Sequence, residues 1–202
     1  MSILPVVLYN DPVLREKAKV ISENTKKLQK LIDDMYDTMY EASGVGLAAP
    51  QIGESVRLFV VDADIMVEDE DDDDLGNKTK YGPMEFINPE IVSKGSDLIE
   101  IEEGCLSLPD LREKVTRPDE ITVKFLDREF KEHEMTFNGW MSRVFQHELD
   151  HLDGVLFIDY LGSFKKRLLA RRLAAIDAGE VETDYEVRGR GEEVKRGRWE
   201  GE

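Results

Sequence analysis

The sequence has a single cysteine, Cys105, so the chain cannot form an internal disulfide. It also lacks any apolar run near the roughly 18 residues that a membrane-spanning helix requires. The apolar stretch within residues 1–17 has no basic region before it and no small-residue cleavage site after it. Because a secretory signal needs both features, we expect no signal peptide, no membrane association and a cytoplasmic location.

Positive charge is scarce relative to negative charge. The chain has 27 Lys and Arg residues against 44 Asp and Glu residues, a net charge of −17. Such a surface repels phosphates, so we expect no DNA binding. Part of the excess lies in the acidic run 67–78, which we predict to be a solvated loop. This run lacks the interleaved ligands and turn glycine of a calcium-binding loop, so we assign it no site.

Three segments show the residue spacing of helices. In 24–42 apolar residues recur every three or four positions, and Asn24 or Thr25 can cap the start. Segment 138–154 is apolar around much of its circumference, so we expect it to be central. Segment 163–179 is expected to be a third helix, with Ser163 as its cap and Gly179 at its end.

Other segments have the composition or alternation of β-strands. These are 56–64, 84–92 with an interruption at Pro89, 97–104, and a hairpin over 120–137. Strands followed by a central helix predict an α+β fold, with small antiparallel or mixed sheets packed around a metal-binding helix. We expect one catalytic domain over residues 1–179. Residues 180–202 are rich in charge and glycine, and we expect them to be a flexible charged tail.

The central helix carries two of the chain's three histidines, His147 and His151, with Glu148 directly after the first. Side chains four residues apart on a helix point the same way, so the histidines could hold one metal ion while Glu148 reaches a metal-bound water. The alternative is that both are half-buried core residues. They extend the apolar stripe of Trp140 and Val144, where an unsatisfied imidazole is costly. We therefore favour a metal site.

A catalytic metal site needs a third protein ligand and an open position. In one class of zinc peptidases the third ligand is an acidic residue further along the chain, and Asp177 is available here. Cys105 is the better candidate, because it follows a predicted strand at a point where a turn would expose it. Its thiolate is a strong ligand for Zn²⁺ or Fe²⁺.

With these residues in view, the chain resembles the peptide deformylase family. The resemblance is carried by GVGLAAPQIG (44–53), EGCLSLP (103–109) and QHELDHLDG (146–154), which occur in the family's order. It extends over roughly residues 3–175. The resemblance implies removal of the formyl group from the N-terminal formylmethionine of newly synthesised polypeptides. An HExxH-type metallopeptidase, with a different third ligand, is the alternative.

The resemblance also implies roles for individual residues. Cys105, His147 and His151 would bind one divalent metal ion, with Fe²⁺ expected and Zn²⁺, Ni²⁺ or Co²⁺ as substitutes. Glu148 would be the general base for a metal-bound water and then the acid that protonates the leaving amine. The Gln51 side chain and the Leu106 N–H would stabilise the oxyanion. Gly46 would let the substrate backbone approach closely.

The remaining implications concern substrate and partners. Val45, Trp140 and Val144 would line the methionine pocket, and Arg112 and Arg143 could contact the substrate chain. Glu41 and Arg117 resemble a supporting ion pair. The basic helix segment 165–172 could contact the ribosome, although an exposed amphipathic helix explains it equally well. We expect a monomer or a weak oligomer.

Overall fold

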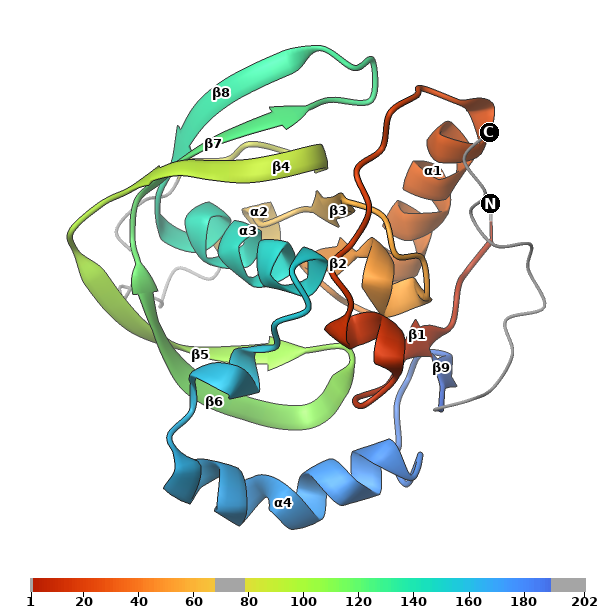
Figure 1. The fold of residues 1–202 in the computed structure, drawn as a ribbon, viewed down its shortest axis with the longest axis vertical. Helices are drawn as coiled ribbons and strands as arrows, with labels where there is room; N and C mark the ends of the chain where they lie inside the picture. Colours follow the sequence, from red (N-terminus) through yellow and green to blue (C-terminus); the bar gives the residue numbers. More distant parts are fainter. Residues whose placement is uncertain (1, 68–78, 190–202) are drawn as a thin grey trace.

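In the computed structural model, which describes residues 2–67 and 79–189, three small sheets surround one central helix (Figure 1). A five-stranded antiparallel sheet has the order β2-β3-β4-β7-β8. A hairpin pairs β5 with β6, and a short parallel pair joins β1 to β9. The predicted α+β fold is therefore confirmed. None of the described helices is long and apolar enough to cross a membrane.

The strands have the following bounds: β1 Val6–Val7, β2 Gly46–Ala48, β3 Leu58–Val61, β4 Met84–Lys94, β5 Leu98–Cys105, β6 Leu108–Pro118, β7 Ile121–Leu126, β8 Glu132–Phe137 and β9 Val187–Arg188. The α-helices are α1 Lys26–Glu41, α2 Asp64–Val67, α3 Gly139–Leu152 and α4 Ser163–Asp177. Single 3₁₀ turns are η1 Pro12–Arg15, η2 Ala49–Ile52 and η3 Phe157–Tyr160.

The five-stranded sheet is covered on both faces, which explains the uninterrupted apolar sequence of β3. Phe59 and Val61 face the core beneath α3, where Phe145 meets Phe59 and Phe86 at ring-centroid distances of 5.1 and 5.0 Å. Leu58 and Val60 face the other way, into the core that α1 covers. A strand buried on both faces has no polar side to alternate with, so all four of its residues are apolar.

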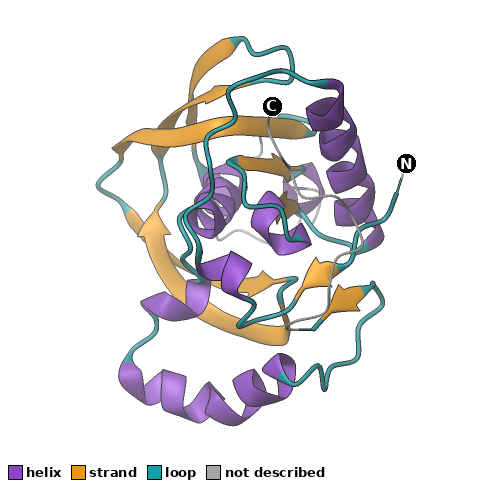
Figure 2. Cartoon of the chain, turned by 45° about the vertical axis from the view of Figure 1, so that its right-hand side comes forward, coloured by secondary structure: helices purple, strands orange, loops and turns teal. Residues whose placement is uncertain are grey.

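Helix α3 lies between this sheet and the β5–β6 hairpin, as Figures 1 and 2 show. Its Phe145 packs against the sheet, whereas the Arg143 guanidinium donates to the backbone oxygens of Ile99 on β5 and Val115 on β6, at 2.7 and 3.0 Å. The helix therefore has neighbours on opposite sides, as expected from its apolar circumference. It begins next to Asn138, and Gly154 with φ of 74° follows its end.

The predicted cap of α1 is confirmed, whereas the predicted interruption at Pro89 and the predicted cap at Ser163 are wrong. The Thr25 hydroxyl accepts from the Leu28 N–H and caps α1, as expected. Strand β4 continues through Pro89, because the register shifts between Ile87 and Glu90 and a bulge needs no ladder hydrogen bond from proline. Helix α4 has Gly162 at its N-cap and no side-chain cap from Ser163.

The chain after residue 179 differs from the expected flexible tail. Residues Val187–Arg188 form β9, and the Val6 and Leu8 N–H groups donate to the Glu186 and Arg188 oxygens at 2.8 and 3.1 Å. This pairing satisfies backbone groups of β1, which has no other strand neighbour among the residues that the structure describes. The rest of the expected tail, residues 190–202, and nearly all of the predicted acidic loop lie outside the described residues.

Candidate active site

Three side chains of types that can bind a metal ion converge where β5 ends beside the middle of α3. Ligand atoms of Cys105, His147 and His151 all lie within 4.8 Å of one another. The Cys105 Sγ is 3.3 Å from the His151 Nε2. Two ligands bound to one tetrahedral ion by ordinary Zn–S and Zn–N bonds are about 3.5 Å apart, so this spacing fits a shared cation. The histidines come from successive turns of α3, whereas the thiol comes from the hairpin.

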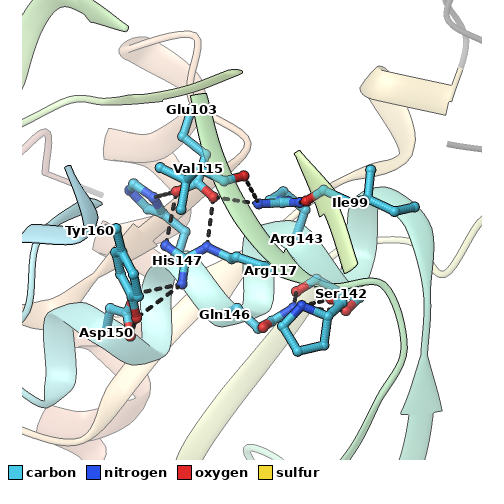
Figure 3. Close-up of polar contacts among 11 residues, drawn as sticks. Ile99, Glu103, Val115, Arg117, Ser142, Arg143, Gln146, His147, Asp150 and Tyr160 are labelled. Atoms are coloured by element: carbon cyan, nitrogen blue, oxygen red, sulfur yellow. Dashed lines mark hydrogen bonds and ion pairs between the residues drawn. The ribbon is translucent and has the colours of Figure 1, made fainter. Parts of the chain in front are cut away.

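A buried carboxylate holds the first histidine in place. The Glu103 Oε2 lies 3.0 Å from the His147 Nδ1, which leaves the other ring nitrogen for the metal position (Figure 3). Arg117 and Arg143 donate to the same carboxylate, at 2.6 Å from the Arg117 Nε and 2.9 Å from the Arg143 Nη1. Burial alone would raise the pKa of Glu103, but the hydrogen bonds from Arg117 and His147 outweigh it and hold that pKa well below its usual range. Such carboxylate–histidine pairs orient metal ligands.

Arg117 should be important for stability because its charge is buried with that of Glu103. Both side chains are 4% exposed. Arg117→Met should lower the free energy of unfolding by about 3–5 kcal/mol, because it removes one partner of a buried ion pair. Urea unfolding in the presence of a chelator measures this. The control is Arg128→Met, because the Arg128 pair with Asp33 is 34% and 55% exposed and should contribute at most about 1 kcal/mol. Equal effects of the two substitutions would contradict the assignment.

Glu148 directly follows His147 in α3, next to the group formed by Cys105, His147 and His151, and its side chain is almost completely buried. The residue is 4% exposed, and its Oε2 has no hydrogen-bond partner within the described residues. Burial raises the pKa of Glu148 to about 7. A carboxyl group with that pKa can both accept and return a proton near neutral pH.

Gly46 is required for the position of the Glu148 carboxylate. A Cβ at residue 46 would lie 2.5 Å from the Glu148 Oε1, closer than real contacts allow. Gly46 lines the cavity, so its expected role of admitting substrate backbone stays a prediction, and its lack of a side chain also leaves space for this carboxylate. The glycine is needed here for its lack of a side chain, since its φ is not positive.

Gly46→Ala should therefore displace Glu148 while leaving the three metal ligands in place. We expect kcat for the reaction proposed below to fall about 100-fold, the effect of moving a catalytic group by roughly 1 Å. Bound metal should be unchanged. The matched control is Gly162→Ala, where an added Cβ meets nothing within 4 Å. A Gly46→Ala enzyme with normal kcat would contradict the inferred crowding.

The ligand group opens into a cavity of about 470 Å³. The cavity brings together all five residues expected to contact substrate, which are Val45, Arg112, Trp140, Arg143 and Val144. Gln51 and Leu106 also line it. The Gln51 Oε1 accepts from the Ala48 N–H at 2.8 Å, which leaves its Nε2 3.5 Å from the Cys105 Sγ.

Other expected contacts differ from the structure. Arg117 pairs with Glu103 and Asp150, not with Glu41. Arg143 is 4% exposed and bonded to Glu103, and it also lines the cavity, so its expected contact with the substrate chain stays a prediction. Asp177, the alternative third ligand, accepts a hydrogen bond from the Asn10 Nδ2 and is not in the ligand group.

Glu103 and Tyr185 are site residues that sequence reasoning missed. For Glu103 a signal existed: in the predicted strand it is two residues before Cys105 and therefore on the same face as the ligand. For Tyr185 there was none, because it lies in the segment expected to be a flexible tail.

Comparison with known proteins agrees with this geometry. The family model described as polypeptide deformylase matches residues 3–167. The chain belongs to this family. It is 52% identical to a peptide deformylase of Salinibacter ruber over 183 residues, which covers 91% of this chain and 93% of that protein.

Solved structures of deformylases show the same fold. A peptide deformylase from Legionella pneumophila has a TM-score of 0.75 and 41% identity, and the match covers 89% of this chain and 98% of that one. A peptide deformylase from Ehrlichia chaffeensis in complex with actinonin has a TM-score of 0.78 and 33% identity, covering 90% of this chain and all (100%) of that one. The deformylase match thus extends over most of the chain.

Proposed function

We propose that this chain is a metal-dependent hydrolase that removes the formyl group from the N-terminal formylmethionine of newly synthesised polypeptides. The observation that carries the proposal is the convergence of Cys105, His147 and His151 beside a buried Glu148. The convergence occurs at a cavity in a chain of the deformylase family. Cys105 belongs to the ligand group and Asp177 does not, so no observation favours the peptidase alternative.

The three ligands would hold one divalent cation. A thiolate with two imidazoles suits Fe²⁺, which we propose as the metal, and also suits Zn²⁺, Ni²⁺ or Co²⁺. When bound, the cation would supply Lewis acidity, which makes water a nucleophile near neutral pH and polarises the formyl oxygen. His147 would keep its Nδ1 hydrogen-bonded to Glu103, as the structure has it.

Glu148 would carry the protons. As the water oxygen bonds to the formyl carbon, Glu148 accepts a proton from that water. When the C–N bond breaks, it donates this proton to the leaving amine of methionine, so that formate and a free N-terminus result. A buried carboxyl with a pKa of about 7 is suited to both steps.

The other cavity residues would place the substrate. The Gln51 Nε2 and the Leu106 N–H would donate to the oxygen that becomes negative during attack, a role that requires donors positioned in advance. Val45, Trp140 and Val144 would surround the methionine side chain. Arg112 would contact the peptide chain.

The decisive experiment is a deformylation assay on a formyl-methionyl tripeptide, with anaerobically purified protein and metal analysis. We expect formate release that stops when a chelator removes the metal and returns when Fe²⁺ is added back. The same peptide without its formyl group should not be cleaved. Cleavage of the internal peptide bonds, or no formate release by metal-loaded protein, would contradict the proposal.

We also propose that α4 contacts the ribosome through its outward cations. Lys165 and Arg172 pair with Glu113 and Asp110, and the Lys166 Nζ donates to the Asp159 backbone oxygen at 3.1 Å. Lys166, Arg167 and Arg171 are all exposed. Phe164 and Leu168 beside them are each 67% exposed. An apolar and basic surface on an otherwise acidic protein is suited to an RNA-rich partner.

Reversing the charge of Lys166, Arg167 and Arg171 together should reduce co-sedimentation with ribosomes at low salt by at least about tenfold. Formate release from a tripeptide should stay unchanged, because these residues lie outside the cavity. The control reverses Lys26, Lys30 and Lys94, which lie on other elements. Equal co-sedimentation of both variants and the unmodified protein would end this proposal.

A further inference from the structure

The turn that follows the ligand cysteine is not held by its own sequence. Leu106 and Ser107 join β5 to β6, and Cys105 pairs directly with Leu108. Two-residue hairpin turns of the favoured types need positive φ at the first central position. Neither Leu106 nor Ser107 has positive φ. The turn is therefore not one of the favoured hairpin types, and contacts from elsewhere in the chain can stabilise its conformation.

Two hydrogen bonds from distant segments reach the turn. The Tyr9 backbone N–H donates to the Ser107 oxygen at 2.8 Å. The Tyr185 hydroxyl donates to the Leu106 oxygen, also at 2.8 Å. The first bond needs only a backbone, whereas the second depends on one particular side chain.

The conformation of residues 179–185, which follow α4, places the Tyr185 hydroxyl at the turn. It leaves the helix through Gly179, whose φ is 73°, and then alternates, with Val181, Thr183 and Tyr185 half-buried and Glu182 and Asp184 exposed. Residues Glu182 to Tyr185 line the cavity. The Thr183 hydroxyl donates to the Tyr185 backbone oxygen at 2.7 Å.

The other side of Tyr185 is anchored by β9. Figure 1 shows β9 beside β1 after the chain returns from α4. The Arg188 guanidinium lies over Gly53, where an added Cβ would be 2.6 Å from its Nη2. Gly53 directly follows η2, the turn that carries Gln51. The C-terminal segment is therefore packed against both loops that supply the proposed oxyanion donors.

We infer that Tyr185 is a positioning residue for deformylation, whose hydroxyl holds the Leu106–Ser107 turn so that the Leu106 N–H is aimed at the developing oxyanion. The inference rests on the proposed function. The hydroxyl binds the Leu106–Ser107 peptide, which is next to the peptide that bears the Leu106 N–H, so Tyr185 acts through the Leu106 backbone and not on the reacting atoms. Since a donor that is free to rotate stabilises the transition state less than one fixed in advance, the hydroxyl should influence kcat more than substrate binding. The family match ends at residue 167, so it does not assign Tyr185.

The test is Tyr185→Phe, which removes only the hydroxyl. We expect kcat on a formyl-methionyl tripeptide to fall about fivefold to tenfold, the loss of one hydrogen bond, with KM changed by less than about twofold. Bound metal should match the unmodified protein, and the thermal unfolding midpoint should fall by no more than about 2–4 °C. Hydrogen exchange of the peptide spanning residues 105–108 should become faster, because the turn has lost its side-chain support.

The matched control is Tyr9→Phe. Tyr9 is half-buried near the same turn, and its hydroxyl makes no hydrogen bond within the part of the chain that the structure describes. This variant should keep both kcat and the slow exchange of residues 105–108.

Three results would overturn the inference: an unchanged kcat in Tyr185→Phe, a raised KM with normal kcat, or unchanged exchange in the turn. Loss of metal from the variant would also overturn it, because Tyr185 would then support the ligand and not the donor. The failure of the proposed function is separate, since metal-loaded unmodified protein would then release no formate.

Discussion

Replacing Glu148 by Gln should lower kcat/KM for a formyl-methionyl peptide by about 10⁴-fold while the metal stays bound. The amide has nearly the same shape as the carboxylate but cannot accept the proton of the attacking water or return it to the amine. General acid–base catalysis contributes typically about 10²–10⁴-fold, and here one residue performs both transfers. Glu148 is 4% exposed, so bulk water cannot readily substitute for it.

The measurement is formate release over a range of peptide concentrations, together with metal content. The control is Glu134→Gln, an exposed position on β8 whose ion pair with Lys124, at 3.4 Å, is also exposed. It should leave both quantities unchanged. If Glu148→Gln retained its activity with normal metal content, Glu148 would not be the base and the proposed mechanism would be wrong.

Replacing Cys105 by Ala should remove the metal and, with it, the activity. The substitution deletes the only thiolate in the group and leaves two imidazoles, which hold a divalent ion far less tightly. Even changes to residues that only support metal ligands lower affinity about 10–100-fold, so the loss of a ligand should exceed about 100-fold. Metal titration monitored by competition with a chromophoric chelator would give the affinity directly.

Ser107→Ala is the matched control for Cys105→Ala. Ser107 lies in the same turn, is fully buried at 0% exposure, and its Oγ has no hydrogen-bond partner among the described residues. Its replacement should leave metal affinity unchanged. A Cys105→Ala protein that bound metal normally would indicate a third ligand elsewhere, as in the peptidase alternative.

The two substitutions are informative together, because they separate metal binding from proton transfer. Glu148→Gln should keep metal and lose turnover, whereas Cys105→Ala should lose both. A protein in which both variants kept metal and turnover would have neither the proposed centre nor the proposed reaction.

Local sequence predicted those parts of the fold in which one pattern acts alone. The spacing of Leu28, Ile32, Met35 and Met39 predicted α1, and these side chains do pack in one core. Alternation predicted the β7–β8 hairpin. The predicted interruption at Pro89 was wrong, because β4 has a bulge there and a bulged position needs no ladder hydrogen bond. A bulge depends on the partner strand, here β7, and so cannot be predicted from β4 alone. The bounds of β9 depend on β1, which lies about 180 residues away in the sequence.

The candidate site divides in the same way. The spacing of His147, Glu148 and His151 made them a candidate group, because helix geometry alone sets the direction of their side chains. Cys105 was the better third-ligand candidate because it follows a predicted strand, and the resemblance then implied the same residue. The partner of Arg117 was predicted incorrectly, because a long side chain can reach many positions and the packing decides which one it occupies.

By itself, the sequence determined the ligand types, the helix that carries two of them and the family to which the chain belongs. The tertiary structure alone decided that Glu103 orients His147, that Gly46 makes room for Glu148 and that the C-terminal segment reaches the turn after Cys105. The physical reason is distance along the chain. A repeat of 3.6 or 2 residues can be read locally, whereas a contact between segments exists only once the core has brought them together.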